Sequence, residues 1–281
     1  MTLPTSTVPL DSDERLLQRA MLAASAAGEL LLARPADLVV ESKSSATDAV
    51  TAMDRASEDL LVRMLLADGA TDAVLGEEGG ERAGSSGVRW VLDPLDGTVN
   101  YLYGLPEWAV SVAAQRQGRT VAGVVAAPLL QRRWWAVAGG GAWTALGDDE
   151  PRRLQVGGER RLGHALTGTG FGYAADRRGR QGELLARVIA ELRDVRRIGS
   201  AAIDLCYVAG GEFDAYFEQG LHEWDSAAAA LIVAEAGGAV EVLADWEPDG
   251  SALTAAANPD LLRELRALLV AAQSSRRSSL G

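Results

Sequence analysis

The second half of the chain alternates short apolar runs with longer segments of helical periodicity, and this alternation restricts the folds available to it. Candidate strands lie at 165–168, 194–198, 213–217 and 239–243, and candidate helices at 181–193, 201–208, 225–235 and 259–271. Because such alternation usually places helices over the faces of a sheet, the second half predicts an α/β arrangement.

The first half of the chain begins with two helical patterns. Apolar residues at three- and four-residue spacing, after a cap at Asp11 or Ser12, predict a helix that ends at about Ala33. A second helix is expected to start near Asp54. The polar stretch 41–47 between them is expected to form an exposed loop or a hairpin.

Strand-like runs follow these helices. The run 88–92 is expected to end as a strand at Asp93-Pro94, because proline cannot donate a ladder hydrogen bond. The runs 109–115, 120–126 and 133–137 are separated by glycine-containing turns and predict an antiparallel meander. Layered sheets and helices are therefore the expected architecture.

The chain shows no internal repeat and no long linker, although 281 residues could form one large domain or two closely packed ones. The glycines at 139–141 and Gly147 are interpreted as loop residues, not as a domain break. We expect one domain over 1–281, with possible halves at 13–150 and 151–272, and a disordered tail at 273–281.

The composition excludes several classes of protein. A formal charge of -12 argues against a nucleic-acid surface. No apolar run approaches the ~18 residues of a membrane span, and residues 1–15 lack the pattern of a signal peptide. The single cysteine, Cys206, is expected to be a buried apolar residue, and it permits no intrachain disulfide. A cytoplasmic protein without membrane or nucleic-acid partners is expected.

Three groups of acidic residues stand in unusual surroundings. Glu77-Glu78 lies between glycines, Asp93 and Asp96 flank Pro94-Leu95, and Asp225 follows a tryptophan. Alone, these residues are typical of a solvated loop, a surface turn and a helix N-cap, respectively. Together they favour a site for a hard divalent cation, which prefers oxygen ligands.

The motifs themselves resemble a known family. Its central signature matches Asp93-Pro94-Leu95-Asp96-Gly97-Thr98-Val99-Asn100-Tyr101. Further matches are Gly76-Glu77-Glu78, the segments 43–54 and 197–202, Trp224-Asp225 and Glu235-Ala236-Gly237-Gly238. Over about residues 13–272, the chain resembles the inositol monophosphatase family of Mg²⁺-dependent, Li⁺-sensitive phosphatases, and among them the bacterial inositol-1-monophosphatases.

This resemblance implies an αβαβα layered fold and commonly a homodimer. It also implies two or three Mg²⁺ ions. Glu77, Asp93 and the Leu95 carbonyl would hold the first ion, and Asp93, Asp96 and Asp225 the second, while Glu77 would help to hold a weaker third.

The resemblance further implies the catalytic and substrate contacts. Thr98 and Asp54 would orient and deprotonate the attacking water, and Glu77 would assist. The substrate contacts implied are Gly97 and Thr98 for the phosphate, Gly199, Ser200, Ala201 and Glu218 for the alcohol, and Glu77, Leu95, Asp96 and Asp225 beside the metals.

The substrate expected is a small phosphate monoester, with myo-inositol 1-phosphate favoured. The segment 199–202 resembles the inositol type, and Glu218 can accept hydrogen bonds from vicinal hydroxyls. Histidinol phosphate and fructose 1,6-bisphosphate stay open, and a bisphosphate would need cations such as Arg177, Arg178, Arg196 or Arg197. A regulatory binding protein on the same fold is the non-enzymatic alternative.

Overall fold

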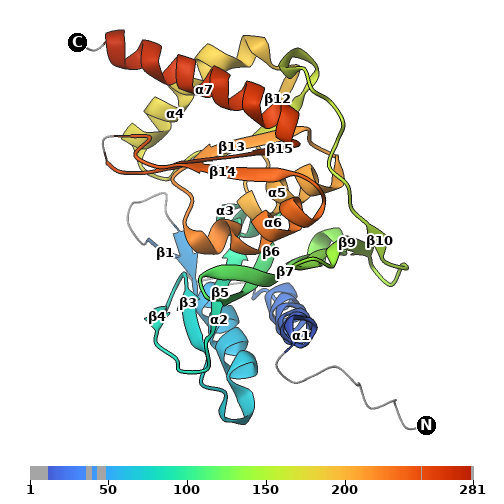
Figure 1. The fold of residues 1–281 in the computed structure, drawn as a ribbon. Helices are drawn as coiled ribbons and strands as arrows, with labels where there is room; N and C mark the ends of the chain where they lie inside the picture. The colour runs from blue at the N-terminus through green and yellow to red at the C-terminus, as the bar shows by residue number, and fades with distance from the viewer. Residues whose placement is uncertain (1–11, 36–39, 43–48, 248, 280–281) are drawn as a thin grey trace.

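Helices and sheets alternate in layers in the computed structural model, in the order helix, sheet, helix, sheet, helix (Figure 1). The structure describes residues 12–35, 40–42, 49–247 and 249–279. The expected αβαβα arrangement is confirmed.

The first two layers come from the N-terminal half. Within the described ranges an eight-stranded sheet has the order β10-β9-β8-β7-β6-β5-β3-β4, and only β3 and β5 pair in parallel. Its strands are β3 (Ala73–Gly76), β4 (Gly80–Arg82), β5 (Val88–Asp96), β6 (Ala109–Arg116), β7 (Arg119–Ala127), β8 (Arg132–Val137), β9 (Gly141–Leu146) and β10 (Arg152–Arg153). The helices α1 (Asp13–Leu32) and α2 (Ala52–Leu65) cover one face. Ser12 caps α1 as expected, since its side chain accepts a hydrogen bond from the Arg15 N–H.

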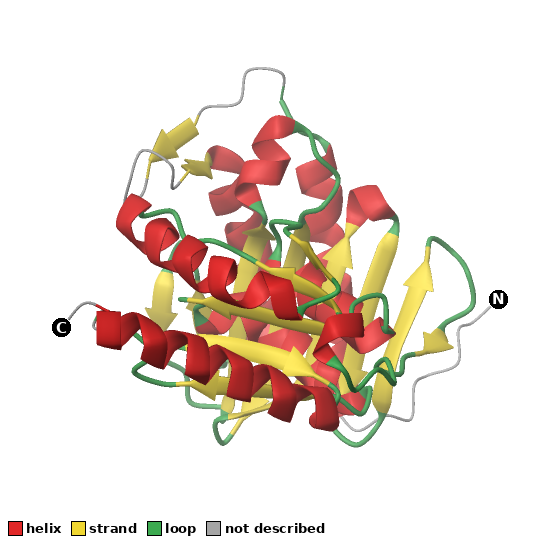
Figure 2. Ribbon diagram, turned by 90° about the horizontal axis from the view of Figure 1, so that it is seen from above, coloured by secondary structure: helices red, strands yellow, loops and turns green. Residues whose placement is uncertain are grey.

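The other sheet comes from the C-terminal half and has the order β12-β11-β13-β15-β14. Its strands are β11 (Leu166–Thr169), β12 (Asp194–Arg196), β13 (Ala215–Gln219), β14 (Ala239–Leu243) and β15 (Leu253–Ala257). The helices α4 (Ala175–Val188) and α7 (Pro259–Ser279) lie side by side over its outer face (Figure 2). The helices α5 (Ala201–Gly210) and α6 (Glu223–Glu235) fill the space between the two sheets.

Alternating side chains divide the core into layers. Along β5, Trp90 and Leu92 pack against α1 and α2, while Val91 faces α5 and α6. Along β13, Ala215 and Phe217 pack under the outer helices, while Tyr216 faces the middle layer. Because successive strand residues point to opposite faces, both sheets are apolar on both sides. Cys206 lies buried in the middle layer, as expected.

Several element boundaries differ from the sequence-based expectations. The helix expected at 181–193 is α4, which begins at Ala175 and ends at Val188, before a 3-10 turn at Ile189–Glu191. The strand β9 starts at Gly141, which was interpreted as a loop glycine. The strand β15 was missed, because its small residues Leu253–Ala257 carry a weak strand signal.

The expectation of a disordered tail from residue 273 is wrong for residues 273–279. The helix α7 continues to Ser279. Gln273 is buried, and its amide donates hydrogen bonds to the Trp246 carbonyl (2.9 Å) and to Glu247 (3.1 Å). These tertiary contacts hold a helix turn that the polar composition alone does not indicate.

The remaining elements are short. The strands β1 (Val40–Ser42) and β2 (Ala49–Thr51) pair antiparallel, in agreement with the expected hairpin, and α3 (Thr98–Tyr103) follows β5. Most of the polar stretch 41–47, with the motif residues 43–45, lies outside the described residues. Short 3-10 turns lie at Ala67–Gly69, Pro128–Leu130 and Leu162–His164.

Candidate active site

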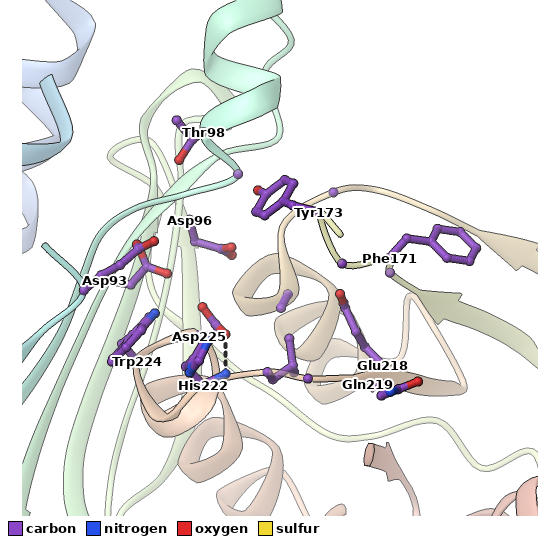
Figure 3. A pocket seen from close by; sticks show the side chains of 18 of the residues that line it. Asp93, Asp96, Thr98, Phe171, Tyr173, Glu218, Gln219, His222, Trp224 and Asp225 are labelled. Atoms are coloured by element: carbon purple, nitrogen blue, oxygen red, sulfur yellow. Dashed lines mark hydrogen bonds between the residues drawn. The ribbon is translucent and has the colours of Figure 1, made fainter. Parts of the chain in front are cut away.

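A pocket of about 360 Å³ lies where the C-terminal end of β5, the start of α6 and the loop after β11 meet (Figure 3). Ten of the residues expected in the site line it: Glu77, Asp93, Leu95, Asp96, Gly97, Thr98, Gly199, Ala201, Glu218 and Asp225. Asp54 and Ser200 lie behind this wall and contact Thr98 and Asp96. The structure thus brings together all the side chains that the sequence motifs selected.

The segment 93–98 lines one wall of the pocket, and its conformation differs from the one expected from the sequence. The strand β5 does not end at Asp93-Pro94 but continues to Asp96. Asp93 pairs with Ser111 and Asp96 with Ala109, so three steps along β5 match two along β6. This bulge accommodates Pro94, which has no N–H to offer the ladder, and it turns both aspartates into the pocket.

Local contacts fix the turn after the bulge. The Leu95 N–H donates to Asp93 Oδ1 at 3.0 Å. Gly97 has φ 89°, and a Cβ there would lie 2.9 Å from the Glu107 carbonyl oxygen, so only glycine fits. The Thr98 hydroxyl lies 3.1 Å from both Asp54 Oδ1 and the Leu95 carbonyl oxygen. The hydroxyl and the carboxylate are thus paired at the edge of the pocket.

The helix α2 supports the site through its buried polar face. Asp54, Ser57 and Glu58 are all buried. The Ser57 hydroxyl donates to the Pro94 carbonyl oxygen at 2.9 Å, and Glu58 accepts hydrogen bonds from the segment that follows Glu77. Sequence reasoning missed Ser57 and Glu58, although their helical spacing from Asp54 and from the buried stripe further along α2 could have indicated an inward-facing polar patch.

Asp96 and Asp225 are anchored from the second half of the chain. Asp96 Oδ2 accepts hydrogen bonds from the Ser200 hydroxyl (2.5 Å) and the Ala202 N–H (2.8 Å). Asp225 Oδ2 accepts from the His222 N–H at 2.6 Å. The helix N-cap is His222 and not Asp225, which occupies the third helical position of a capping box. The Ser200 hydroxyl thus supports a carboxylate and caps α5, and its expected contact with substrate stays a prediction.

Burial and mutual repulsion shape the charge of this wall. Burial raises the pKa of Asp93 well above its usual range, and the neighbouring Glu77, Asp96 and Asp225 raise it further. Burial raises the pKa of Asp96 to about 6, although bonds from Ser200 and Ala202 favour the ionised form. The pKa of Asp225 is raised by burial and by Asp96. A bound cation would relieve this repulsion.

The oxygen donors fit a hard divalent cation such as Mg²⁺. Asp93, Asp96 and Asp225 each use a carboxylate oxygen in an anchoring hydrogen bond. No three His, Cys, Asp or Glu side chains of the described residues already stand in a metal-holding arrangement. Asp93, Asp96 and Asp225 nevertheless line one pocket, and carboxylate oxygens are the donors that a hard divalent cation prefers.

The opposite side of the pocket differs in composition. Glu218 on β13 is half-buried, and burial raises its pKa to about 7. Its Oε2 accepts a hydrogen bond from the Tyr216 hydroxyl at 2.5 Å. Phe171, Tyr173 and Arg177 lie beyond it. Sequence reasoning missed Phe171 and Tyr173, which line the pocket, and Tyr216, which supports Glu218 from behind it, because their positions depend on distant segments.

The four candidate cations for a second anion site separate into two groups. Arg177 and Arg197 line the pocket. Arg178 instead donates to the carbonyls of the loop after β11, and Arg196 pairs with Asp194 at 2.6 Å. The pocket thus combines a carboxylate wall with two guanidinium groups on its other side.

The two histidines and the paired tryptophans have other roles. The His222 ring stacks on Trp224 with centroids 4.7 Å apart, beside Asp225, whereas His164 is exposed. Trp134 is fully buried and Trp135 packs on the opposite face of the sheet, so packing accounts for both.

A layered αβαβα fold with a carboxylate-lined pocket defines the class of metal-dependent phosphatases that the motifs suggested. The model of the inositol monophosphatase family matches residues 12–277, and the chain belongs to this family. The family is one of metal-dependent phosphatases.

Individual relatives agree with this assignment. The chain is 48% identical over 239 residues to inositol-1-monophosphatase SuhB of Mycobacterium tuberculosis, covering 83% of this chain and 82% of the relative. It is 41% identical over 233 residues to the Nus factor SuhB of Pseudomonas aeruginosa, covering 80% and 84%. The extragenic suppressor protein suhB from Bartonella henselae superposes with a TM-score of 0.81 at 35% identity, covering 91% and 98%.

Proposed function

We propose that this protein hydrolyses a small phosphate monoester with Mg²⁺, and that myo-inositol 1-phosphate is the preferred substrate. The convergence of Asp93, Asp96 and Asp225 on one pocket wall, beside the Thr98–Asp54 pair, carries the proposal. Inositol-1-monophosphatase is also the name of a relative that is 48% identical.

The proposed metal ligands are those implied by the motifs. Glu77, Asp93 and the Leu95 carbonyl would hold one Mg²⁺, Asp93, Asp96 and Asp225 a second, and Glu77 would contribute to a weaker third. Bound Mg²⁺ would stabilise charge on the phosphoryl and leaving oxygens and would make water more acidic. Anchoring by Leu95, Ser200 and His222 holds these carboxylates in place before any ion binds.

The Thr98–Asp54 pair would move the proton of the attacking water. The Thr98 hydroxyl is too weakly acidic to lose its proton and then act as a base by itself. Its 3.1 Å contact with Asp54 Oδ1 lets it accept a proton from water while it donates its own proton to the carboxylate. The N–H groups of Gly97 and Thr98 would hold the phosphate, and the left-handed conformation of Gly97 supports this approach.

The alcohol would bind between Glu218 and the segment 199–201. Glu218 can accept hydrogen bonds from vicinal hydroxyls, which suits inositol. Arg177 and Arg197 on the same side keep fructose 1,6-bisphosphate as an alternative substrate, because they could bind a second phosphate. Histidinol phosphate is the third candidate.

A regulatory binding role is a different class of function, and the name Nus factor of a 41% identical relative gives it specific support. The complete set of carboxylates favours catalysis. Within the described residues no helix has the length and apolar composition to span a membrane. We also propose one domain over the layered core, a homodimer, Li⁺ inhibition and a cytoplasmic location.

Phosphate release by the purified protein tests these alternatives. We expect hydrolysis of inositol 1-phosphate in preference to histidinol phosphate and fructose 1,6-bisphosphate, and loss of activity after exhaustive chelation with recovery on Mg²⁺ addition. Full activity after chelation would overturn the metal scheme. A preference for histidinol phosphate would overturn only the substrate. No release from any ester, despite bound metal, would favour the binding role.

A further inference from the structure

The helix α2 contacts three separate segments of the site through three polar side chains. Asp54 contacts Thr98, Ser57 binds the Pro94 carbonyl, and Glu58 binds the turn after β3. These residues stand at i, i+3 and i+4, which places them on one face of the helix. Leu61 and Leu65 continue this stripe in the core. The inner face of α2 therefore makes hydrogen bonds to the site in its first turns and apolar contacts with the core further along.

Glu58 has the most demanding of these contacts. Its Oε2 accepts from the Glu78 N–H at 2.8 Å, and its Oε1 accepts from the Gly79 N–H at 2.6 Å. The preceding N–H, that of Glu77, donates to the Leu92 carbonyl on β5 at 3.3 Å. Three successive N–H groups thus donate hydrogen bonds: that of Glu77 donates to the sheet, and those of Glu78 and Gly79 donate to the Glu58 carboxylate.

Close packing shows how tightly the turn surrounds this carboxylate. A Cβ at Gly76 would lie 2.5 Å from Glu58 Oε2, and one at Gly79 would lie 2.6 Å from Oε1. Both glycines have ordinary backbone conformations, since neither has a positive φ. The absence of a side chain there is therefore explained by the approach of Glu58 and not by backbone strain.

We propose that Glu58 is a positioning residue for the metal site: its carboxylate fixes the turn 76–79 and thereby the direction in which Glu77 presents its own carboxylate. This inference rests on the proposed role of Glu77 as a metal ligand. Glu58 itself is not a metal ligand in this scheme, because both of its oxygens are occupied by N–H groups.

The chemistry requires a carboxylate at this position. Two N–H donors converge on two oxygens, and a glutamine offers one oxygen and one NH₂ group. In Glu58→Gln the NH₂ group would face a backbone N–H, so one hydrogen bond would become a repulsion between donors. The volume is unchanged, so the variant alters the turn without leaving a cavity.

Asp72 provides a matched control. It is also a buried carboxylate of the N-terminal half, and it accepts from Trp90 Nε1 at 2.9 Å and from Arg19 at 3.1 Å. Neither Asp72 nor these two partners line the pocket. Asp72→Asn therefore removes a buried charge and weakens the fold without touching the turn 76–79.

The experiment measures metal affinity apart from turnover. Binding of Mn²⁺ to the full-length protein is followed by the loss of the free-ion electron paramagnetic resonance signal, and Mg²⁺ activation curves give kcat at saturation. We expect Glu58→Gln to weaken Mn²⁺ binding and to raise the half-activating Mg²⁺ concentration by about 10-fold or more, with kcat at saturating Mg²⁺ within a few-fold of wild type. Asp72→Asn should lower Tm but leave Mn²⁺ affinity unchanged.

Gly79→Ala gives a second, independent test if Glu58→Gln does not fold. Its Cβ would displace the turn from the same carboxylate while Glu58 keeps its charge, and we expect Mn²⁺ affinity to fall in the same direction. Wild-type affinity in a folded Glu58→Gln or Gly79→Ala protein would overturn this inference. Failure of the wild-type protein to bind Mn²⁺ would overturn the proposed function instead.

Discussion

The two walls of the pocket are built differently. In the wall from the N-terminal half, Asp54 on α2, Asp93 on β5 and Thr98 at the start of α3 are 0%, 1% and 6% exposed, and Asp96 is half-buried. The wall from the C-terminal half includes a loop, where Tyr173 is 38% exposed and Ala174 and Arg197 are also exposed. Glu218 and Asp225 on that side are half-buried.

This difference in burial suggests that the packed wall carries out the hydrolysis and that the exposed loop selects the alcohol of the substrate. Groups on packed strands and helices keep their geometry, as metal ligands and a proton acceptor require. Loop residues can change without disturbing the core, so they are suited to choosing the alcohol. Changes to the first wall, or to the proposed metal ligand Asp225 on the second, should therefore reduce the hydrolysis of every substrate. Changes to the rest of the second wall should affect substrates unequally.

The largest effect is expected at Asp93, which both proposed metal sites share. Asp93→Asn retains the oxygen that accepts from the Leu95 N–H and so retains the turn, but it removes the charge. We expect kcat/KM to fall by on the order of 10²- to 10³-fold for all substrates, measured by phosphate release across a range of Mg²⁺ concentrations.

Asp72→Asn is again the control, since it should lower Tm while kcat/KM stays near the wild-type value. Near-normal turnover of Asp93→Asn at ordinary Mg²⁺ levels would mean that the first wall does not hold the metals in the proposed way.

Local motifs predicted the continuous segments that line the pocket, but not the contacts between distant segments that hold them. The turn 93–98 is a continuous segment, so its carboxylates and glycine could be assigned from the sequence. The side chain of Ser200 could not, because it binds Asp96 across 104 residues of chain. Glu58 was missed for the same reason, since only the folded turn 76–79 shows what it binds.

One feature of the segment 93–98 differed from the expectation. Proline was expected to end the strand at Asp93, but the bulge opposite Ser111 lets β5 continue past Pro94. A bulge depends on the pairing strand, β6, and so cannot be inferred from the sequence of β5 alone.

The comparison between walls can be sharpened at Gly170. A Cβ there would lie 1.9 Å from Glu218 Oε2, so Gly170→Ala must displace the Glu218 carboxylate. We expect KM for inositol 1-phosphate to rise about tenfold, which corresponds to ~1.4 kcal/mol. Hydrolysis of an aryl phosphate, which has no vicinal hydroxyls, should change little in steady-state assays.

Gly182→Ala is the matched control for this substitution. Gly182 lies in α4 with nothing within 4 Å of an added Cβ, so the variant should leave KM unchanged and slightly raise Tm. Equal losses with both substrates in Gly170→Ala would show that the second wall does not select the alcohol.

The smallest effect is expected at Tyr216, which donates to Glu218 without lining the pocket. Tyr216→Phe removes about 1 kcal/mol of hydrogen bonding, so KM for inositol 1-phosphate should rise about fivefold while the aryl phosphate is unaffected. Tyr207→Phe is the control, because Tyr207 packs on Phe213 and Trp134 away from the pocket.

The pH dependence distinguishes positioning by Tyr216 from simple loosening of the wall. Burial raises the pKa of Glu218 to about 7 and Asp96 raises it as well, while the Tyr216 hydroxyl and Arg197 lower it. Loss of the hydroxyl removes a donor to the ionised carboxylate, so the pKa of Glu218 must rise. The acidic limb of kcat/KM for inositol 1-phosphate should then move to higher pH in Tyr216→Phe, and an unmoved limb would exclude ionised Glu218 from alcohol binding.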